Sequence, residues 1–146
     1  MSGHRQARAL RGGVVPTVGL VALVVLVNGA AASASTAGVP KAMAGCWHRH
    51  APALPVGTSA GVWLIKLTTS GELLAYTPGT TSCNQEPDFT GRISVAGSRL
   101  TIGQLPVCPT KGAYTWKASK RVLTLKATKD SCSSRKLLFT GTWAKI

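Results

Sequence analysis

Two histidines are the first side chains of this chain that could do chemistry. His48 and His50 stand two positions apart, so on a strand they would share one face and could begin a metal site. No third ligand follows at a useful spacing, and Arg49 adds positive charge between them. We therefore read both histidines as polar residues near a strand end, and we expect no bound metal.

The acidic residues offer little more to a reaction mechanism. Glu86 and Asp88 flank a proline in a polar stretch, and nothing in the sequence buries them or places a partner beside them. Asp130 can pair with Lys129 or Arg135, which indicates a structural role. The chain has no nucleophile motif and no glycine-rich phosphate loop. We expect a protein that is not an enzyme and that carries no cofactor.

The N-terminal residues have the three parts of a secretory signal. Basic residues precede an apolar run over 14–27, and small residues at 30–34 fit signal peptidase. We expect a signal peptide over 1–34, a flexible lead-in over 35–44, one domain over 45–146, and secretion. Two alternatives stay open, both of which would hold the protein at a membrane. The signal could stay uncut, or Cys46 could be lipidated, since Met43-Ala44-Gly45 before it resembles a lipobox.

Composition after residue 34 indicates a small, basic, exported domain. These 112 residues hold all four cysteines, 14 of the 17 Lys and Arg, and four acids, a net charge of +10. An even number of cysteines in a short exported chain predicts a disulfide framework. The positive charge favours anionic surfaces, and export makes nucleic acid the least suitable of them.

Apolar and polar residues alternate in eight short segments, which is the period-two pattern of half-buried strands. The segments lie around 45–49, 62–67, 73–77, 89–95, 100–103, 113–118, 121–127 and 135–144. Their even spacing predicts an all-β fold, a small antiparallel up-and-down barrel of about eight strands, with a β-sandwich as the alternative. Closing the barrel leaves no free sheet edge, as suits a monomer.

The barrel prediction also suggests a disulfide pairing. In a closed meander the first and last strands are neighbours, which would bring Cys46 near Cys132. Cys83 and Cys108 would then pair across the middle of the sheet. Each bridge is expected to contribute roughly 2–4 kcal/mol.

Three Gly-x-Trp triplets carry a resemblance to a known family; they begin at Gly45, Gly61 and Gly141. Lipocalins begin their first strand with such a triplet, and an Arg near the end of their barrel packs over its Trp. Trp47 and Arg135 resemble that pair, which implies structural roles for them and for Trp143. The last 35 or so residues resemble strand motifs of small exported actinobacterial proteins with lipocalin-like, calycin-type barrels, and residues 45–104 do so loosely. The residues that carry this match are Gly112-x-Tyr114-x-Trp116, Leu123-x-Leu125, Asp130-x-Cys132-x-x-Arg135 and Gly141-x-Trp143.

Two functions follow from this reading. The first is a binding module for a small apolar or amphipathic ligand, held by the inward-facing aromatic residues Trp63, Tyr114, Trp116 and Phe139. The second is an interaction with an anionic cell-envelope surface through basic residues of the hairpin over 113–129 and no interior ligand. Those basic residues are Lys117, Lys120, Arg121, Lys126 and Lys129.

Overall fold

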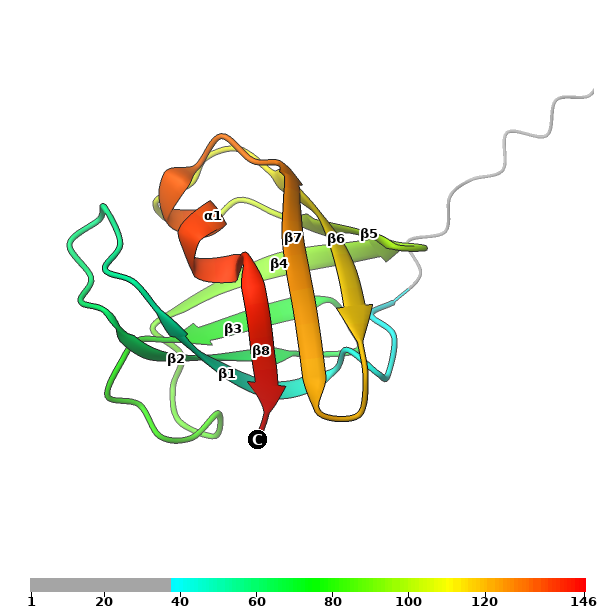
Figure 1. Ribbon diagram of the computed structural model, residues 1–146, viewed down its shortest axis with the longest axis horizontal. Coiled ribbons are helices and arrows are strands. Elements are labelled where there is room, and N and C mark those ends of the chain that lie inside the picture. Colours follow the sequence, from blue (N-terminus) through cyan, green and yellow to red (C-terminus); the bar gives the residue numbers. More distant parts are fainter. Residues whose placement is uncertain (1–37) are drawn as a thin grey trace, which may run out of the picture. The chain divides into compact units, whose positions relative to one another are not determined.

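Eight strands and one short helix form the described part of the chain, residues 38–146 of a computed structural model (Figure 1). The signal peptide predicted over 1–34 falls outside the described residues. Each strand pairs antiparallel with the next and β8 pairs with β1, so the predicted all-β, up-and-down barrel is confirmed. The elements are β1 (Gly45–Ala51), β2 (Gly61–Leu67), β3 (Glu72–Tyr76), β4 (Phe89–Ala96), β5 (Arg99–Ile102), β6 (Gly112–Ala118), β7 (Val122–Lys129), α1 (Ser133–Phe139) and β8 (Gly141–Lys145).

The barrel interior is filled by the alternating apolar residues of the strands. On β2, the side chains of Trp63, Ile65 and Leu67 are buried in the main core. On β4, Ile93 and Val95 are buried while the residues between and beside them are exposed. An eight-stranded barrel is just wide enough for such side chains to fill it. No helix of the described residues is long and apolar enough to cross a membrane.

The segment expected as the last strand, 135–144, is instead the helix α1 followed by β8. Arg135, Leu138 and Phe139 are buried and Leu137 is exposed, a spacing of three and four that suits a helix. The prediction was wrong because Leu137, Phe139, Gly141 and Trp143 also fit a period of two. In a stretch this short, the two periods cannot be told apart.

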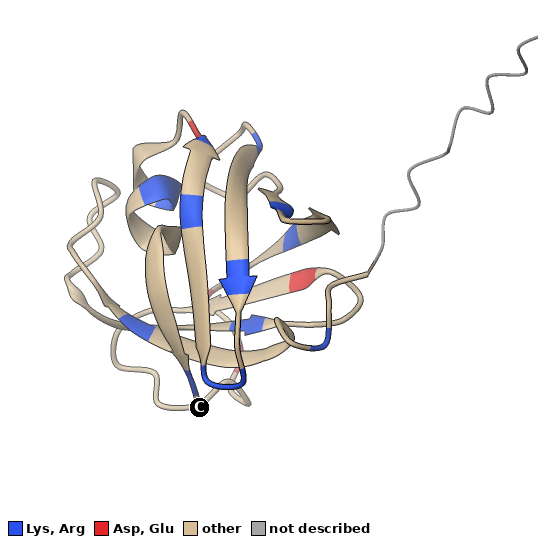
Figure 2. Ribbon diagram, turned by 45° about the vertical axis from the view of Figure 1, so that its right-hand side comes forward, with Lys and Arg blue, Asp and Glu red and all other residues tan. Residues whose placement is uncertain are grey.

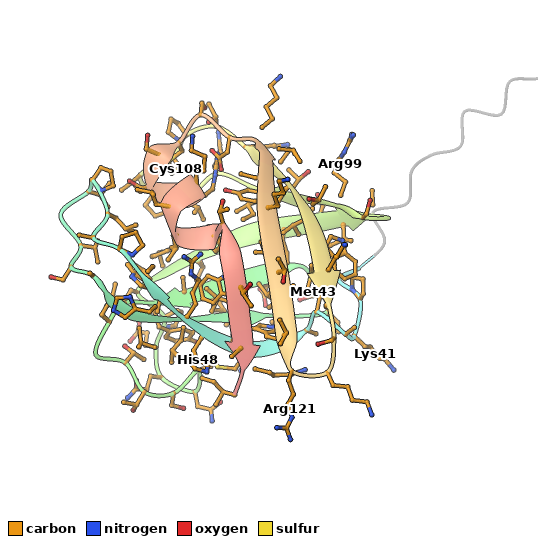
Figure 3. All side chains as sticks on the ribbon, in the orientation of Figure 1. Lys41, Met43, His48, Arg99, Cys108 and Arg121 are labelled. Carbon is orange, nitrogen blue, oxygen red and sulfur yellow. A yellow bond between two sulfur atoms is a disulfide. The ribbon has the colours of Figure 1, made fainter. Side chains whose placement is uncertain are left out.

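The barrel has two unlike ends. The mouth end carries the long loops 52–60, 77–88 and 103–111 together with the segment 130–140, which contains α1. The closed end carries the short turns 68–71, 97–98 and 119–121 and the C-terminus. In Figure 3, Cys108 lies at the mouth end beside α1, and Arg121 lies at the opposite end.

Residues 38–44 cover the closed end in place of a flexible lead-in. Val39 and Met43 are buried in the main core, and the Val39 amide donates to the carbonyl of Thr69, 3.1 Å away. The indole Nε1 of Trp47 donates to the Met43 carbonyl at 2.9 Å. The composition of this segment suggested a linker, but its two large apolar side chains close the bottom of the barrel.

The predicted disulfide pairing is wrong, because Cys46 bonds Cys83 and Cys108 bonds Cys132. The first and last strands are indeed neighbours, but Cys46 lies at the closed end and Cys132 at the mouth end. The loop 77–88 instead folds back along the outside of the barrel. There Cys83 joins Leu64 and Tyr76 in a small second cluster, and the Tyr76 hydroxyl donates to the Cys83 carbonyl at 2.9 Å.

The seam between β1 and β8 closes the barrel with few ladder positions. Only Trp47–Lys145 and His48–Ala144 stand opposite each other across it. Two cation–π contacts reinforce the seam reciprocally. Lys145 Nζ of β8 lies 5.0 Å from the ring centre of Trp47 on β1, and the Arg49 guanidinium of β1 lies 5.6 Å from that of Trp143 on β8. The expected contact of Arg135 with Trp47 is thus wrong, since Lys145 takes that place.

The first and third Gly-x-Trp triplets share one geometry at this seam. Gly45 and Gly141 have φ values of +132° and +133°. A Cβ on Gly45 would stand 2.9 Å from Cε of Lys145, and a Cβ on Gly141 would stand 2.8 Å from Nη1 of Arg49. In both triplets, therefore, the missing side chain lets a cation from the neighbouring strand reach the Trp two residues on.

Replacing Gly141 tests this arrangement against a matched glycine. Gly79 also has positive φ, +106°, but a Cβ there would meet nothing within 4 Å. We expect Gly79→Ala to lower the free energy of unfolding by about 1–2 kcal/mol through backbone strain. Gly141→Ala should cost at least about 1 kcal/mol more, because Arg49 must also leave Trp143. Equal losses in urea denaturation would contradict the proposed role of Arg49.

Candidate functional site

A cavity of about 290 Å³ opens at the mouth end of the barrel. Its walls come from three loops, the ends of two strands and α1, and they are mainly apolar. Binding sites for small molecules are typically such apolar hollows with a few fixed polar groups. Its lining residues include Leu54, Val56, Trp63, Phe89, Leu105, Val107 and Leu138, with the polar residues Thr77, Asp88, Ser134 and Arg135.

Two matching turns contribute to the walls of the cavity. The loops 52–60 and 103–111 each contain a Leu-Pro-Val sequence, at 54–56 and 105–107. Each turn is held by backbone hydrogen bonds that begin at its leucine, with Leu54 bonded to Thr58 and Leu105 to Cys108. Both leucines are 7% exposed, whereas Val56 and Val107 are 47% and 56% exposed. Each loop therefore supplies a wall residue and an apolar tip at the rim.

Trp63 belongs to the second Gly-x-Trp triplet and differs from the other two tryptophans of this motif. Trp47 and Trp143 donate their Nε1–H to the carbonyl four residues before them, at 2.9 and 3.2 Å. Trp63 lines the cavity and is 1% exposed, yet its Nε1 has no partner among the described residues. A buried donor without an acceptor costs about 1–3 kcal/mol.

The ring of Trp63 is held in place by its neighbour across the cavity wall. Phe89 meets it edge to face, with ring centres 6.3 Å apart. Such pairs add roughly 0.5–1.5 kcal/mol beyond the area they bury. Packing against Phe89 therefore positions the Trp63 indole, which makes no hydrogen bond of its own.

A buried ion pair fixes the opposite wall. Two guanidinium nitrogens of Arg135 donate to Asp130, Nε to Oδ2 and Nη2 to Oδ1, each at 2.7 Å. The remaining nitrogen of Arg135 donates to the carbonyls of Gly103 and Thr110. The Tyr114 hydroxyl donates to the same carboxylate. This network ties α1, β6 and the loop 103–111 together, and the bond between Cys108 and Cys132 links the same segments.

The network also determines which groups of the wall are charged. Burial opposes ionisation of Asp130, but the hydrogen bonds from Arg135, Tyr114 and the Cys132 amide outweigh it and lower the pKa of this carboxyl. The bond to Asp130 raises the pKa of Arg135. Burial, followed by the contact with Asp130, raises the pKa of the Tyr114 phenol. Both charges of the pair are therefore present at neutral pH and compensate each other.

Asp88, the acid that lines the cavity, is also hydrogen-bonded. Asp88 Oδ2 accepts hydrogen bonds from the amide of Thr77, at 2.7 Å, and from its hydroxyl, at 3.1 Å. Within the described residues, one further buried polar side-chain atom, Thr140 Oγ1, lacks a partner.

The four residues predicted to bind a ligand lie in different places. Trp63 lines the mouth cavity. Tyr114 is bonded to Asp130, and Phe139 packs from α1 against Trp143 with ring centres 6.3 Å apart. Trp116 is half-buried near the closed end, where its Nε1 donates to the Gly97 carbonyl at 3.0 Å. The structure thus does not bring these four aromatic residues together, and their binding role stays a prediction.

Sequence reasoning missed most of the cavity wall, because the wall comes from loops. Leu54 and Leu105 are not part of any alternating segment, and Leu138 falls out of step with the strand expected there. The repeated Leu-Pro-Val sequence was the available signal. Apolar residues around a proline, in loops on one end of a barrel, are candidates for a binding rim.

The predicted basic residues are spread along the outside of the barrel. Figure 2 shows Lys and Arg on β6, on β7, in the turn between them and on α1. Within residues 38–146, no group of three or more His, Cys, Asp or Glu is placed to hold a metal ion.

No protein-family model, no curated protein and no solved structure matches the chain.

Removing the carboxylate of Asp130 tests the network that shapes the cavity. We expect Asp130→Asn to lower the free energy of unfolding by about 3–5 kcal/mol, because it leaves the Arg135 charge buried without compensation. Asp88→Asn is the control, since this exposed side chain is expected to contribute about 1 kcal/mol. Chemical denaturation at neutral pH measures both, and similar small losses would contradict the buried pair.

The same pair predicts the pH dependence of stability. A carboxyl whose pKa is lowered by folding stabilises the fold above its unfolded-state pKa, ordinarily about 3.8, and loses this contribution as the pH falls through the lower folded value. We expect the free energy of unfolding to decline as the pH drops below about 3.8. This decline should be shallower in Asp130→Asn, and in Asp88→Asn it should be as steep as in the wild type. An unchanged profile in Asp130→Asn would assign the acid sensitivity to other carboxyls.

Proposed function

We propose that this protein is an extracellular binding module whose mouth cavity takes a small, neutral, mainly apolar molecule with one hydrogen-bond acceptor. The unpartnered Nε1–H of Trp63 in an apolar wall carries this proposal. The two disulfides are consistent with an extracellular protein.

The charge state of the cavity favours a neutral ligand. Arg135 has its counter-charge in Asp130, and Asp88 is bonded to Thr77. A charged ligand would have to leave water without an opposite charge free to receive it, which is costly. A carbonyl or ether oxygen, in contrast, would satisfy Trp63 and leave the rest of the ligand to the apolar wall.

The size of the cavity limits the ligand as well. About 290 Å³ is just below the range of roughly 300–1,000 Å³ that small-molecule sites occupy. The barrel below the cavity is filled by its own side chains, among them Trp47, Tyr114, Phe139 and Trp143. The proposal is therefore a ligand held at the mouth and not one enclosed along the barrel axis.

A matched pair of probes tests the role of Trp63. 2-Acetylnaphthalene and 2-ethylnaphthalene have similar size, but only the first has a carbonyl oxygen. We expect the wild type to bind the acetyl compound roughly threefold to tenfold more tightly, because one net hydrogen bond contributes about 0.5–1.5 kcal/mol. In Trp63→Phe this preference should vanish, and in Trp116→Phe it should persist.

The ¹H–¹⁵N spectrum supplies a direct readout for the same experiment. The chain has four tryptophans, so four indole N–H signals are expected, and the Phe variants assign two of them. The acetyl compound should move the Trp63 signal most. Movement of the Trp116 signal instead, or equal affinity for both probes, would overturn the proposal. Native mass spectrometry of the unreduced protein from its producing cells then searches for the natural ligand as an adduct.

A further inference from the structure

The mouth end presents apolar tips to solvent beside positive charge. Among the described residues, Val56 and Val107 project from the two Leu-Pro-Val turns, and Leu137 of α1 is 40% exposed at the same end. Val62 lies on the outer face of β2, and the other two exposed large apolar residues, Val122 and Ile146, lie at the closed end. In each turn the leucine is buried and the valine is about half-exposed, and all four side chains line the cavity, so both valines lie at its rim.

A hollow beside one of these tips is bordered by basic and hydroxyl residues. It has a volume of about 310 Å³, and Lys111, Lys129, Thr110 and Ser131 are among its lining residues. The hydroxyls of Thr110 and Ser131 hydrogen-bond each other at 3.1 Å. The bond between Cys108 and Cys132 fixes it next to Val107.

The charges of this end are unbalanced. Within the described residues, the ion pair of Asp130 with Arg135 is the one salt bridge, so Lys111, Lys129 and Lys136 keep their positive charge uncompensated. Asp130 is buried in that pair and does not face solvent. Two exposed acids remain at this end, both in the loop 77–88: Asp88, which is hydrogen-bonded to Thr77, and Glu86.

From this arrangement we infer that the mouth end docks on an anionic phospholipid bilayer, with Val56 and Val107 entering the interface and Lys111, Lys129 and Lys136 contacting phosphate headgroups. Apolar tips surrounded by lysines combine the two forces that hold proteins at such surfaces. Docking in this orientation would open the cavity toward the lipid, where apolar molecules partition. The inference does not depend on the proposed function, since the exposed side chains of the rim, and not a ligand in the cavity, would contact the bilayer.

The chain offers matched control variants at its two ends. The charge comparison uses two triple variants. The mouth-end lysine variant combines Lys111→Gln, Lys129→Gln and Lys136→Gln. The closed-end charge variant removes the same charge through Lys117→Gln, Lys120→Gln and Arg121→Gln. The apolar comparison uses two double variants. The mouth-end valine variant combines Val56→Ser and Val107→Ser. The closed-end apolar variant combines Val122→Ser and Ile146→Ser, and these two side chains are 40% and 65% exposed in the wild type. All variants share residues 1–37, so differences among them report on the barrel.

Co-sedimentation with phosphatidylcholine vesicles, with and without phosphatidylglycerol, measures the binding. We expect binding to need phosphatidylglycerol and to be lost near 1 M salt, where the Debye length is about 3 Å. The mouth-end lysine variant should bind on the order of 100-fold more weakly, and the mouth-end valine variant roughly tenfold more weakly. Both closed-end variants should bind as the wild type does.

Other outcomes would overturn the inference. Equal weakening by the two charge variants would mean that net charge alone acts, and weakening by the closed-end variant alone would place the surface on the β6–β7 hairpin. Weaker vesicle binding by the mouth-end lysine variant, with unchanged binding by the mouth-end valine variant, would indicate that the natural partner is a soluble polyanion or wall polymer. Absence of vesicle binding would refute lipid docking outright. Naphthalene-probe binding, measured without vesicles on the mouth-end lysine variant, keeps the cavity proposal separately testable, because none of the three lysines lines the cavity.

Discussion

The structure depends on the closure of the sheet between β1 and β8. Two facing positions would be a weak seam by themselves, and the contacts that strengthen it run both ways across it. Each strand supplies a tryptophan to the core and a cation to the tryptophan of the other strand. A single cation–π contact contributes about 0.5–2 kcal/mol, depending on its exposure to solvent. Because Arg49 also donates to the carbonyls of Leu138 and Thr140, the seam fixes the end of α1 over the mouth as well.

The mouth has a different support, and the difference explains how a cavity persists there. Long loops around an apolar hollow would tend to collapse into it, since apolar surface gains by contact. Here the ion pair of Asp130 and Arg135 holds the loop 103–111 from below, and the bond between Cys108 and Cys132 holds it at its rim. Polar and covalent contacts thus fix the walls at positions that apolar packing alone would not keep.

The sequence was sufficient for the fold but not for the loops. Alternation in segments such as 62–67 and 113–118 predicted the strands, and their spacing predicted the barrel, because both follow from local periodicity. The pairing of Cys46 with Cys83 was not predictable in this way, since it depends on a loop that folds back along the outside of the barrel. Trp63 was predicted to face inward, but Leu54 and Leu105 reach the same cavity from loops, where no period constrains a side chain.

The three Gly-x-Trp triplets show how one motif can serve two purposes. In the first and third, a glycine with φ near +132° admits a cation, and the indole N–H is bonded four residues back. The second has neither feature. Gly61 is not among the glycines with positive φ, and the Trp63 Nε1–H has no hydrogen-bond partner among the described residues. The two triplets that complete the pattern hold the seam. The one that departs from it leaves an unsatisfied buried donor on a residue that lines the cavity. Such donors are rare in folded proteins and call for an explanation, which the proposed ligand would supply.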